Sequence, residues 1–212
     1  MSTKDQQGTE VLMRALKNNE DILPTADPEK ERTVQVCETE RLVIRPLSLD
    51  DVPELTKILS DPEVMKHSIR GVCDEAATRE FIEWSMACYD SSGVGPWALI
   101  DKESAELIGF CGVSPEIVAG VEEANLGYRL ASAYWNKGLA SEAVKGVLGY
   151  VFARKQYRSV VVIIEPEHVA SFKVAEKAGF SEFDTIEFHG RSVQLYRLPA
   201  FSGRETSHPP EL

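Results

Sequence analysis

The chain has 212 residues, and 23 Lys and Arg against 34 Asp and Glu give it a formal net charge of −11. This length suits one domain with a short appendage, and a core of that size requires neither disulfides nor a structural metal. The four cysteines form no Cys-x-x-Cys pair and have no histidine at zinc-finger spacing, so no redox motif or zinc site is indicated. The excess of acid argues against nucleic acid as the main partner; it suits either cationic ligands or plain solubility.

The ends of the sequence differ from its middle. Residues 1–33 are expected to be an extension, either with a short helix around 10–17 that docks on the body or on a second copy, or disordered. A flexible tail is expected at 201–212 and the main domain at 34–200. The polar start has no apolar segment, and no later run approaches the roughly 18 apolar residues that span a bilayer. A cytosolic protein without membrane contact is therefore expected, as a monomer or homodimer.

Helical and strand patterns alternate along the main domain. In chain order they predict a strand at 41–46, a helix capped by 48–51 and ending near 60, a helix at 74–90, strands at 97–100, 107–113 and 124–130, a helix from about 139 to 152, a strand at 160–164, a helix at 168–178, and strands at 180–188 and 191–198. The five β-branched residues of 160–164 predict a strand buried on both faces. The order predicts a mixed α/β domain.

A turn at 135–140 stands between a strand and the start of the long helix. Backbone N–H groups at such a helix start have no helical partner and lie at the positive end of the helix dipole, which suits a phosphate or pyrophosphate. Gly138 lets the backbone approach a ligand closely, and Ala140 and Ser141 leave space beside it. A single glycine is neither a dinucleotide fingerprint nor a P-loop, so plain helix capping is the alternative.

Three blocks in the order 126–130, 134–143 and 165–180 carry a family resemblance. The first reads LGYRL and the second YWNKGLASEA; the third begins with EPEHVAS and ends with EKAGF. The segment ERLVIRP at 40–46 precedes all three. From about residue 39 to 198 the chain resembles the GCN5-related N-acetyltransferase (GNAT) superfamily, in particular the subgroup similar to the ribosomal-protein N-acetyltransferases RimJ and RimL. The resemblance implies a mixed α+β fold, in which a mostly antiparallel central sheet has a splayed parallel strand pair and helices on both faces.

The resemblance also implies a cofactor and a reaction. Acetyl-CoA would be the co-substrate, no metal would be needed, and the acetyl group would pass directly to a primary amine, either a protein N-terminal α-amine or a small amine. The backbone of 136–140 would hold the pyrophosphate, the edge of 128–130 would pair with the pantetheine, and the thioester would lie at the splay. The implied cofactor-binding residues are Tyr128, Arg129, Leu130, Trp135, Asn136, Lys137, Gly138, Leu139, Ala140, Ser141, His168 and Ser171.

This chain departs from the family pattern at the cofactor-binding residues. His168 replaces the usual Asn, either as a cofactor contact or as an ordinary residue at a helix start. Asn136 stands where the subgroup most often has Gly, and the turn is still expected to form because Asn tolerates a positive φ.

The expected catalytic groups are also altered. Many relatives protonate the leaving thiolate with a tyrosine where this chain has Ala175, so Ser171 is the candidate acid, or else a small helix residue that only contacts the cofactor. The usual strand Glu is replaced by Asn125. Glu123, its neighbour Glu122, and Glu187 are the candidate bases; the alternatives are that they are solvated surface carboxylates and that a water chain removes the proton.

Aromatic residues are candidates for the acceptor pocket, with core packing as the alternative. Trp97 and Tyr128 are preferred over Trp84 and Tyr89. A positive patch is expected at 136–141, helped by Lys137 and Lys173, with acid gathered near the splay. Two other functions stay open: a sensor that binds acyl-CoA without turnover, and a partner-docking role for the N-terminal extension.

Overall fold

The computed structural model describes residues 35–200, so the expectations for 1–33 and for the tail at 201–212 lie outside the described residues. The elements are β1 (Cys37–Glu38), β2 (Leu42–Pro46), η2 (Leu49–Asp51), α2 (Val52–Leu59), α3 (Pro62–Met65), α4 (Glu75–Ser92), β3 (Pro96–Asp101), β4 (Leu107–Val118), β5 (Val121–Leu130), η3 (Ser132–Tyr134), α5 (Leu139–Ala153), β6 (Ser159–Ile164), α6 (Val169–Lys177), β7 (Phe183–Phe188) and β8 (Arg191–Pro199).

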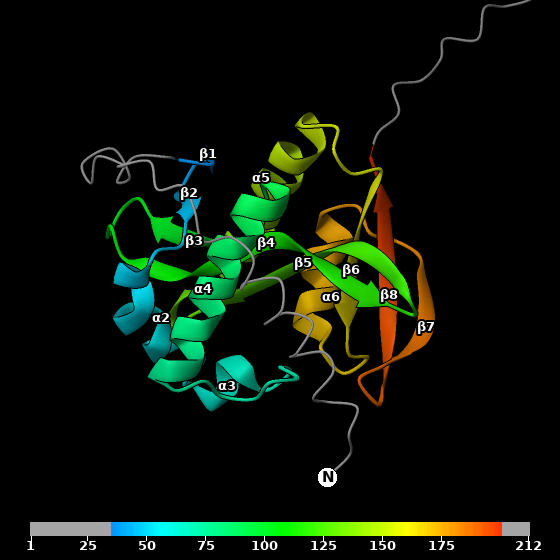
Figure 1. Cartoon of the computed structure of the whole chain (residues 1–212), viewed down its shortest axis with the longest axis horizontal. Coiled ribbons are helices and arrows are strands. Elements are labelled where there is room, and N and C mark those ends of the chain that lie inside the picture. Colours follow the sequence, from blue (N-terminus) through cyan, green and yellow to red (C-terminus); the bar gives the residue numbers. More distant parts are fainter. Residues whose placement is uncertain (1–34, 201–212) are drawn as a thin grey trace, which may run out of the picture. The chain divides into compact units, whose positions relative to one another are not determined.

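Eight strands form one sheet in the order β1-β2-β3-β4-β5-β6-β8-β7, and the strands β6, β8 and β7 make one end of it (Figure 1). Every neighbouring pair is antiparallel except β5 and β6, which are parallel and pair at a single position, Asn125 with Val161. Beyond that position the two strands separate. This geometry confirms the expected mostly antiparallel sheet with a splayed parallel pair.

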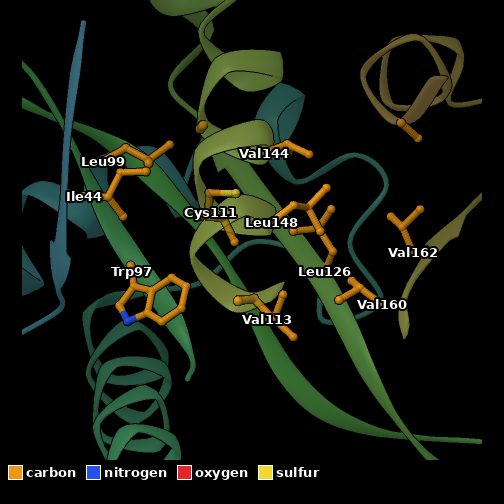
Figure 2. Close-up of a cluster of buried hydrophobic side chains, with 14 of the residues drawn as sticks. Ile44, Trp97, Leu99, Cys111, Val113, Leu126, Val144, Leu148, Val160 and Val162 are labelled. Atoms are coloured by element: carbon orange, nitrogen blue, oxygen red, sulfur yellow. The ribbon is translucent and has the colours of Figure 1, made fainter. Parts of the chain in front are cut away.

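Helices cover both faces of the sheet because side chains alternate along each strand. On one face, apolar side chains of β5 and β6 pack against α5, where Leu126, Val160 and Val162 surround Leu148 (Figure 2). On the other face, Ala98 belongs to a separate buried cluster with residues of α2, α3 and α4. The Asp74 carboxylate caps α4 by accepting a hydrogen bond from the N–H of Ala77 at 2.8 Å.

Several elements differ from the sequence-based expectation. The hairpin β4–β5 is longer than predicted, and its two-residue turn has positive φ at Ala119 (50°) and Gly120 (82°). The sequence pattern did not predict the short helix α3, which begins where the Asp61 carboxylate accepts a hydrogen bond from the N–H of Glu63 at 2.9 Å. Strand β7 begins only at Phe183, because Phe180 is buried in the core immediately after α6.

Within residues 35–200, none of the helices has the length and apolar character to cross a membrane. The same part of the chain holds no group of three or more His, Cys, Asp or Glu side chains arranged to bind a metal ion. All four cysteines are free thiols; Cys37 is half-buried, and Cys73, Cys88 and Cys111 are buried.

Candidate active site

Two cavities meet where β5 and β6 separate. The loop cavity, of about 630 Å³, lies between the end of β5, the turn before α5 and the helix α6. The splay cavity, of about 320 Å³, lies on the side of α4 and is lined by parts of β4, β5, β6 and β8. Five residues line both cavities: His67, Tyr128, Arg129, His168 and Ser171. These residues therefore mark the passage between the two spaces.

The turn before α5 leaves its backbone open toward the loop cavity. Asn136 has a φ of 59° and Gly138 a φ of 80°, so Asn136 does adopt the left-handed conformation that the sequence required of it. No side chain caps the start of α5, which leaves the first N–H groups of the helix without a side-chain partner. A Cβ atom added at Gly138 would meet only Arg41 Nη2, at 3.6 Å, so the space next to this residue is open.

The turn is held in place by Arg41 of the segment before β2. Its Nη1 donates to the carbonyl oxygen of Lys137 at 2.9 Å, and its Nε donates to Glu142 Oε2 at 2.7 Å. Thr39 Oγ1 donates to the other carboxylate oxygen of Glu142 at 2.5 Å. Partial burial raises the pKa of Glu142, but the hydrogen bonds from Thr39 and Arg41 outweigh it and leave that pKa lowered. This clamp joins two segments about a hundred residues apart, and no pattern in the sequence predicts it.

The β5 edge of the loop cavity carries the predicted residues 128–130. The Tyr128 hydroxyl donates to the carbonyl oxygen of Ser171 at 3.3 Å, and burial raises the pKa of Tyr128 to about 12. Leu130 is buried, and its carbonyl oxygen accepts a hydrogen bond from Trp135 Nε1 at 2.8 Å. Because β6 pairs with β5 only at Asn125, the edge after that residue faces the splay without a strand partner.

A pair of stacked histidines stands at the start of α6. His67 and His168 have ring centroids 4.0 Å apart and an interplanar angle of 15°. His168 Nε2 lies 3.3 Å from Ser171 Oγ, and His67 Nδ1 lies 2.8 Å from Glu165 Oε2. Burial, and then the electrostatic effects of the nearby His67 and Arg129, lower the pKa of His168 to about 4. His168 is therefore neutral at pH 7 and bonds to the predicted acid Ser171.

Sequence reasoning missed His67 and Glu165. Burial raises the pKa of Glu165, but hydrogen bonds from His67 and Arg191 outweigh it and leave the pKa lowered. His67 and Glu165 are 98 residues apart in the chain. No local sequence pattern predicts this pair, because it forms only when the loop after α3 packs against the end of β6.

The structure does not bring the carboxylates predicted as bases to either cavity. Glu123 forms an ion pair with Arg197, with Oε1 2.5 Å from Nη2, and the hydrogen bond from Arg197 lowers the pKa of Glu123. Glu187 is exposed on β7, and Glu122 is exposed on β5. Neither cavity has any of the three among its lining residues.

Of the aromatic candidates, Tyr128 and Trp84 line the splay cavity and the other two do not. Trp97 is only 2% exposed and packs edge-on against Tyr150 with ring centroids 5.5 Å apart, so its assignment to the acceptor pocket was wrong. The hydroxyl of Tyr89 accepts from the N–H of Leu47 at 3.1 Å in the interior. Alternation along β3 points Trp97 toward α5, away from the splay cavity.

Charge is distributed around the cavities partly as predicted. The loop cavity is lined by four cations, Lys66, Arg129, Lys173 and Lys177, and one carboxylate, Glu63. Lys173 was expected there; Lys137 instead lies over the Tyr134 ring, 5.0 Å from its centroid. The expectation of acid at the splay was wrong, because the splay cavity has three arginines, Arg70, Arg129 and Arg191, and two carboxylates, Glu116 and Glu165.

Comparison with known proteins gives one matching family. The model for the "Acetyltransferase (GNAT) domain" matches residues 41–181. A protein of Bacillus licheniformis named uncharacterized N-acetyltransferase p20 is 31% identical over 163 residues, which cover 74% of this chain and 91% of that protein.

Solved structures show the same fold. A GNAT-family acetyltransferase from Bacillus anthracis is 25% identical, covers 77% of this chain and 97% of its own, and superposes with a TM-score of 0.64. The ribosomal L7/L12 α-N-protein acetyltransferase RimL in complex with coenzyme A is 17% identical, with coverage of 78% and 97% and a TM-score of 0.63.

Proposed function

The chain belongs to the GNAT acetyltransferase family, and we propose that it moves the acetyl group of acetyl-CoA directly to a primary amine, either a small amine or a peptide N-terminus. The observation that carries the proposal is the meeting of the loop cavity and the splay cavity at Ser171. Each substrate then has its own space, and the two reach the same point from opposite sides of the opened sheet.

The loop cavity fits acetyl-CoA by its chemistry. The uncapped N–H groups at the start of α5 and the open space at Gly138 suit a pyrophosphate. Lys173 and Lys177 add positive charge nearby. The free backbone edge of 128–130 suits an amide-bearing chain, which it can bind as a further strand would. The bound thioester supplies the activated acetyl group.

The transfer itself requires one bond to form and one to break. The amine nitrogen attacks the thioester carbonyl carbon, the carbon–sulfur bond breaks, the sulfur takes up a proton, and the amine releases a proton to water. We assign the proton that the sulfur takes up to Ser171, which is 8% exposed at the junction and then recovers a proton from water. In its Nε2–H tautomer, the neutral His168 donates to Ser171 Oγ and leaves the hydroxyl hydrogen free for the sulfur.

A thiol-release assay with acetyl-CoA and a panel of amines and peptides tests the proposal. We expect at least one acceptor to raise the rate well above slow hydrolysis, with an acetylated product of the expected mass. Calorimetric titration with CoA runs in parallel. If CoA binds but no acceptor raises the rate, the acyl-CoA sensor replaces the transferase. A cytosolic location, and a monomer or homodimer, stay predictions from the sequence.

A further inference from the structure

Arg129 is a half-buried guanidinium without a carboxylate partner in the described part of the chain. Its one hydrogen bond goes from Nη1 to the carbonyl oxygen of the adjacent Tyr128, at 2.8 Å. A guanidinium has five N–H donors, and a partly buried charge without a counter-charge is costly. Burial accordingly lowers the pKa of Arg129. Glu165 attracts this guanidinium but forms its ion pairs with His67 and Arg191, so no described carboxylate pairs with Arg129.

A comparison with Arg45 shows how unusual this is. Arg45 and Arg129 are the two half-buried arginines between residues 35 and 200. Arg45 forms two hydrogen bonds with Asp51, at 2.8 and 2.7 Å. The exposed Arg41, Arg191 and Arg197 also have carboxylate partners. The chain has 34 acidic residues, yet Arg129 has no carboxylate partner and borders two cavities. This indicates that its partner anion belongs to a ligand.

A second orphaned polar group lies on the same strand. The Oδ1 atom of Asn125 is buried without a hydrogen-bond partner in the described structure. Asn125 lines the splay cavity and is the residue at which β5 last pairs with β6. A buried acceptor without a donor costs free energy that a ligand N–H group would recover.

Open space separates these two groups. Asn125, Gly127 and Arg129 lie on the same face of β5, and a Cβ atom added at Gly127 would meet nothing within 4 Å. The Cα atoms of Asn125 and Arg129 are about 13 Å apart at the usual strand rise. The strand thus presents a hydrogen-bond acceptor, a gap and a cation in order.

We infer that the splay cavity recognises a primary amine that also bears a carboxylate, with Arg129 pairing the carboxylate and Asn125 accepting a hydrogen bond from the amine. The inference rests on the proposed acetyl transfer and names the substrate class of the same site. Arg70 lines only the splay cavity, has no ion pair within residues 35–200, and adds positive charge for the carboxylate. A cavity of about 320 Å³ suits a free amino acid or the start of a peptide with an acidic side chain.

Two other features of the site define the competing outcomes. Glu116 also lines the splay cavity, and a cationic acceptor such as a polyamine would pair with it; burial, however, raises the pKa of Glu116 and so disfavours its charged form. Arg129 also borders the loop cavity, so it would serve the cofactor instead if its loss weakened CoA binding.

The test compares acceptors that differ only in the carboxylate. The pairs are aspartate with asparagine amide, alanine with alaninamide, and C-amidated peptides that begin Ala-Asp or Ala-Asn; spermidine serves as the cationic acceptor without a carboxylate. Values of kcat/KM are compared per neutral amine, because the amides have a lower amine pKa. We expect the acceptor with the carboxylate to have a kcat/KM at least tenfold higher than its partner. The amino-acid and peptide pairs show whether the substrate is a free amino acid or a peptide N-terminus. Equal rates within the pairs, or a preference for spermidine, would overturn the inference but leave acetyl transfer standing.

Variants then assign the preference to residues. Arg129→Gln is expected to reduce the ratio of kcat/KM between the carboxylate and amide acceptors below about threefold, and Arg70→Gln to reduce this ratio in part. The exposed Arg158→Gln, which lines neither cavity, is the matched control. An Arg129→Gln protein that loses CoA affinity but keeps the ratio would overturn the inference. Should that protein not fold, Arg129→Lys keeps the charge and is expected to lower the ratio.

A binding measurement separates this inference from the proposed function. Protein loaded with CoA is titrated with N-acetylaspartate and with N-acetylasparagine amide, which bears no carboxylate, and the acid is expected to bind at least tenfold more tightly. If no amine is acetylated although CoA binds, the proposed function fails, and this titration alone decides whether the cavity selects a carboxylate. Equal binding of the two compounds would overturn the inference.

Discussion

Ser171 is the side chain at the junction on which protonation of the leaving thiolate depends in the proposed reaction. We expect Ser171→Ala to lower kcat by roughly tenfold to a thousandfold, the usual range for a general acid. The KM for acetyl-CoA should change little, because the backbone at 171 stays in place. Steady-state kinetics measure both constants. Ser181→Ala, on an exposed position after α6, is the control. A fall in kcat of less than about threefold would assign Ser171 to packing.

His168 gives a prediction for stability against pH. Its pKa is about 4 in the folded protein against an ordinary value of 6.5, so between these values the unfolded chain binds the proton that the folded protein does not. Protonation therefore favours unfolding as the pH falls from 6.5 to 4. Because the ring is partly exposed, we discount the full shift and expect this to cost about 1–2 kcal/mol at pH 4.

The variant His168→Asn removes this titration while keeping a polar side chain. Urea unfolding at pH 4.5 and 7.5 measures the difference, and the variant should lose about 1 kcal/mol less than the native protein between the two values. At pH 7.5 histidine is neutral in both states, so that measurement gives the pH-independent cost of the substitution. Equal losses for both proteins would contradict the lowered pKa of His168.

At the scale of an element, the turn before α5 is expected to control acetyl-CoA binding. Gly138→Glu places a carboxylate where the pyrophosphate is expected, and should raise the KM for acetyl-CoA by at least tenfold. Gly138→Ala is the matched control. It carries the strain of a positive φ, about 1 kcal/mol, without the charge, and a Cβ has room there. An unchanged KM in Gly138→Glu would mean that the pyrophosphate lies elsewhere.

Elements with a strong local signal were predictable and those set by tertiary contacts were not. The helix α5 and the strand β6 follow from apolar spacing and from five consecutive β-branched residues. The outer half of the hairpin β4–β5 escaped prediction because Ser114, Pro115 and Glu116 read as loop, although cross-strand pairing continues through them. The pattern around Trp97 predicted a strand, but it did not predict which face of the sheet the Trp97 side chain packs on.

The candidate site divides in the same way. Motif residues placed the turn 136–140 and the start of α6, because these stretches are contiguous in the sequence. His67, Glu165 and the clamp of Arg41 on Lys137 are contacts between distant segments, so no spacing reveals them. The orphaned Oδ1 of Asn125 is likewise visible only once its surroundings are known. Sequence therefore located the cofactor side of the site far better than the acceptor side.

Across the whole molecule, the net charge of −11 opposes an anionic co-substrate, and local arrangement has to overcome it. Four cations and one carboxylate line the loop cavity, so a positive region exists within an acidic protein. The splay cavity is also not acidic, because Arg70, Arg129 and Arg191 outnumber its two carboxylates. The acid excess therefore lies mainly outside both cavities, where it serves solubility.

This arrangement predicts a salt-dependent contribution of α6 to acetyl-CoA binding. The double variant Lys173→Gln/Lys177→Gln removes two of the four cations of the loop cavity and should raise the KM for acetyl-CoA about three- to tenfold at low ionic strength, with kcat little changed. Since the Debye length falls to a few ångströms near 1 M salt, the difference from the native protein should shrink there. Lys145→Gln, on the exposed side of α5, is the control and should leave KM unchanged. A KM unaffected by the double variant would show that the backbone amides alone hold the phosphates. A KM raised equally at both salt concentrations would show that the two lysines do not act through their charge.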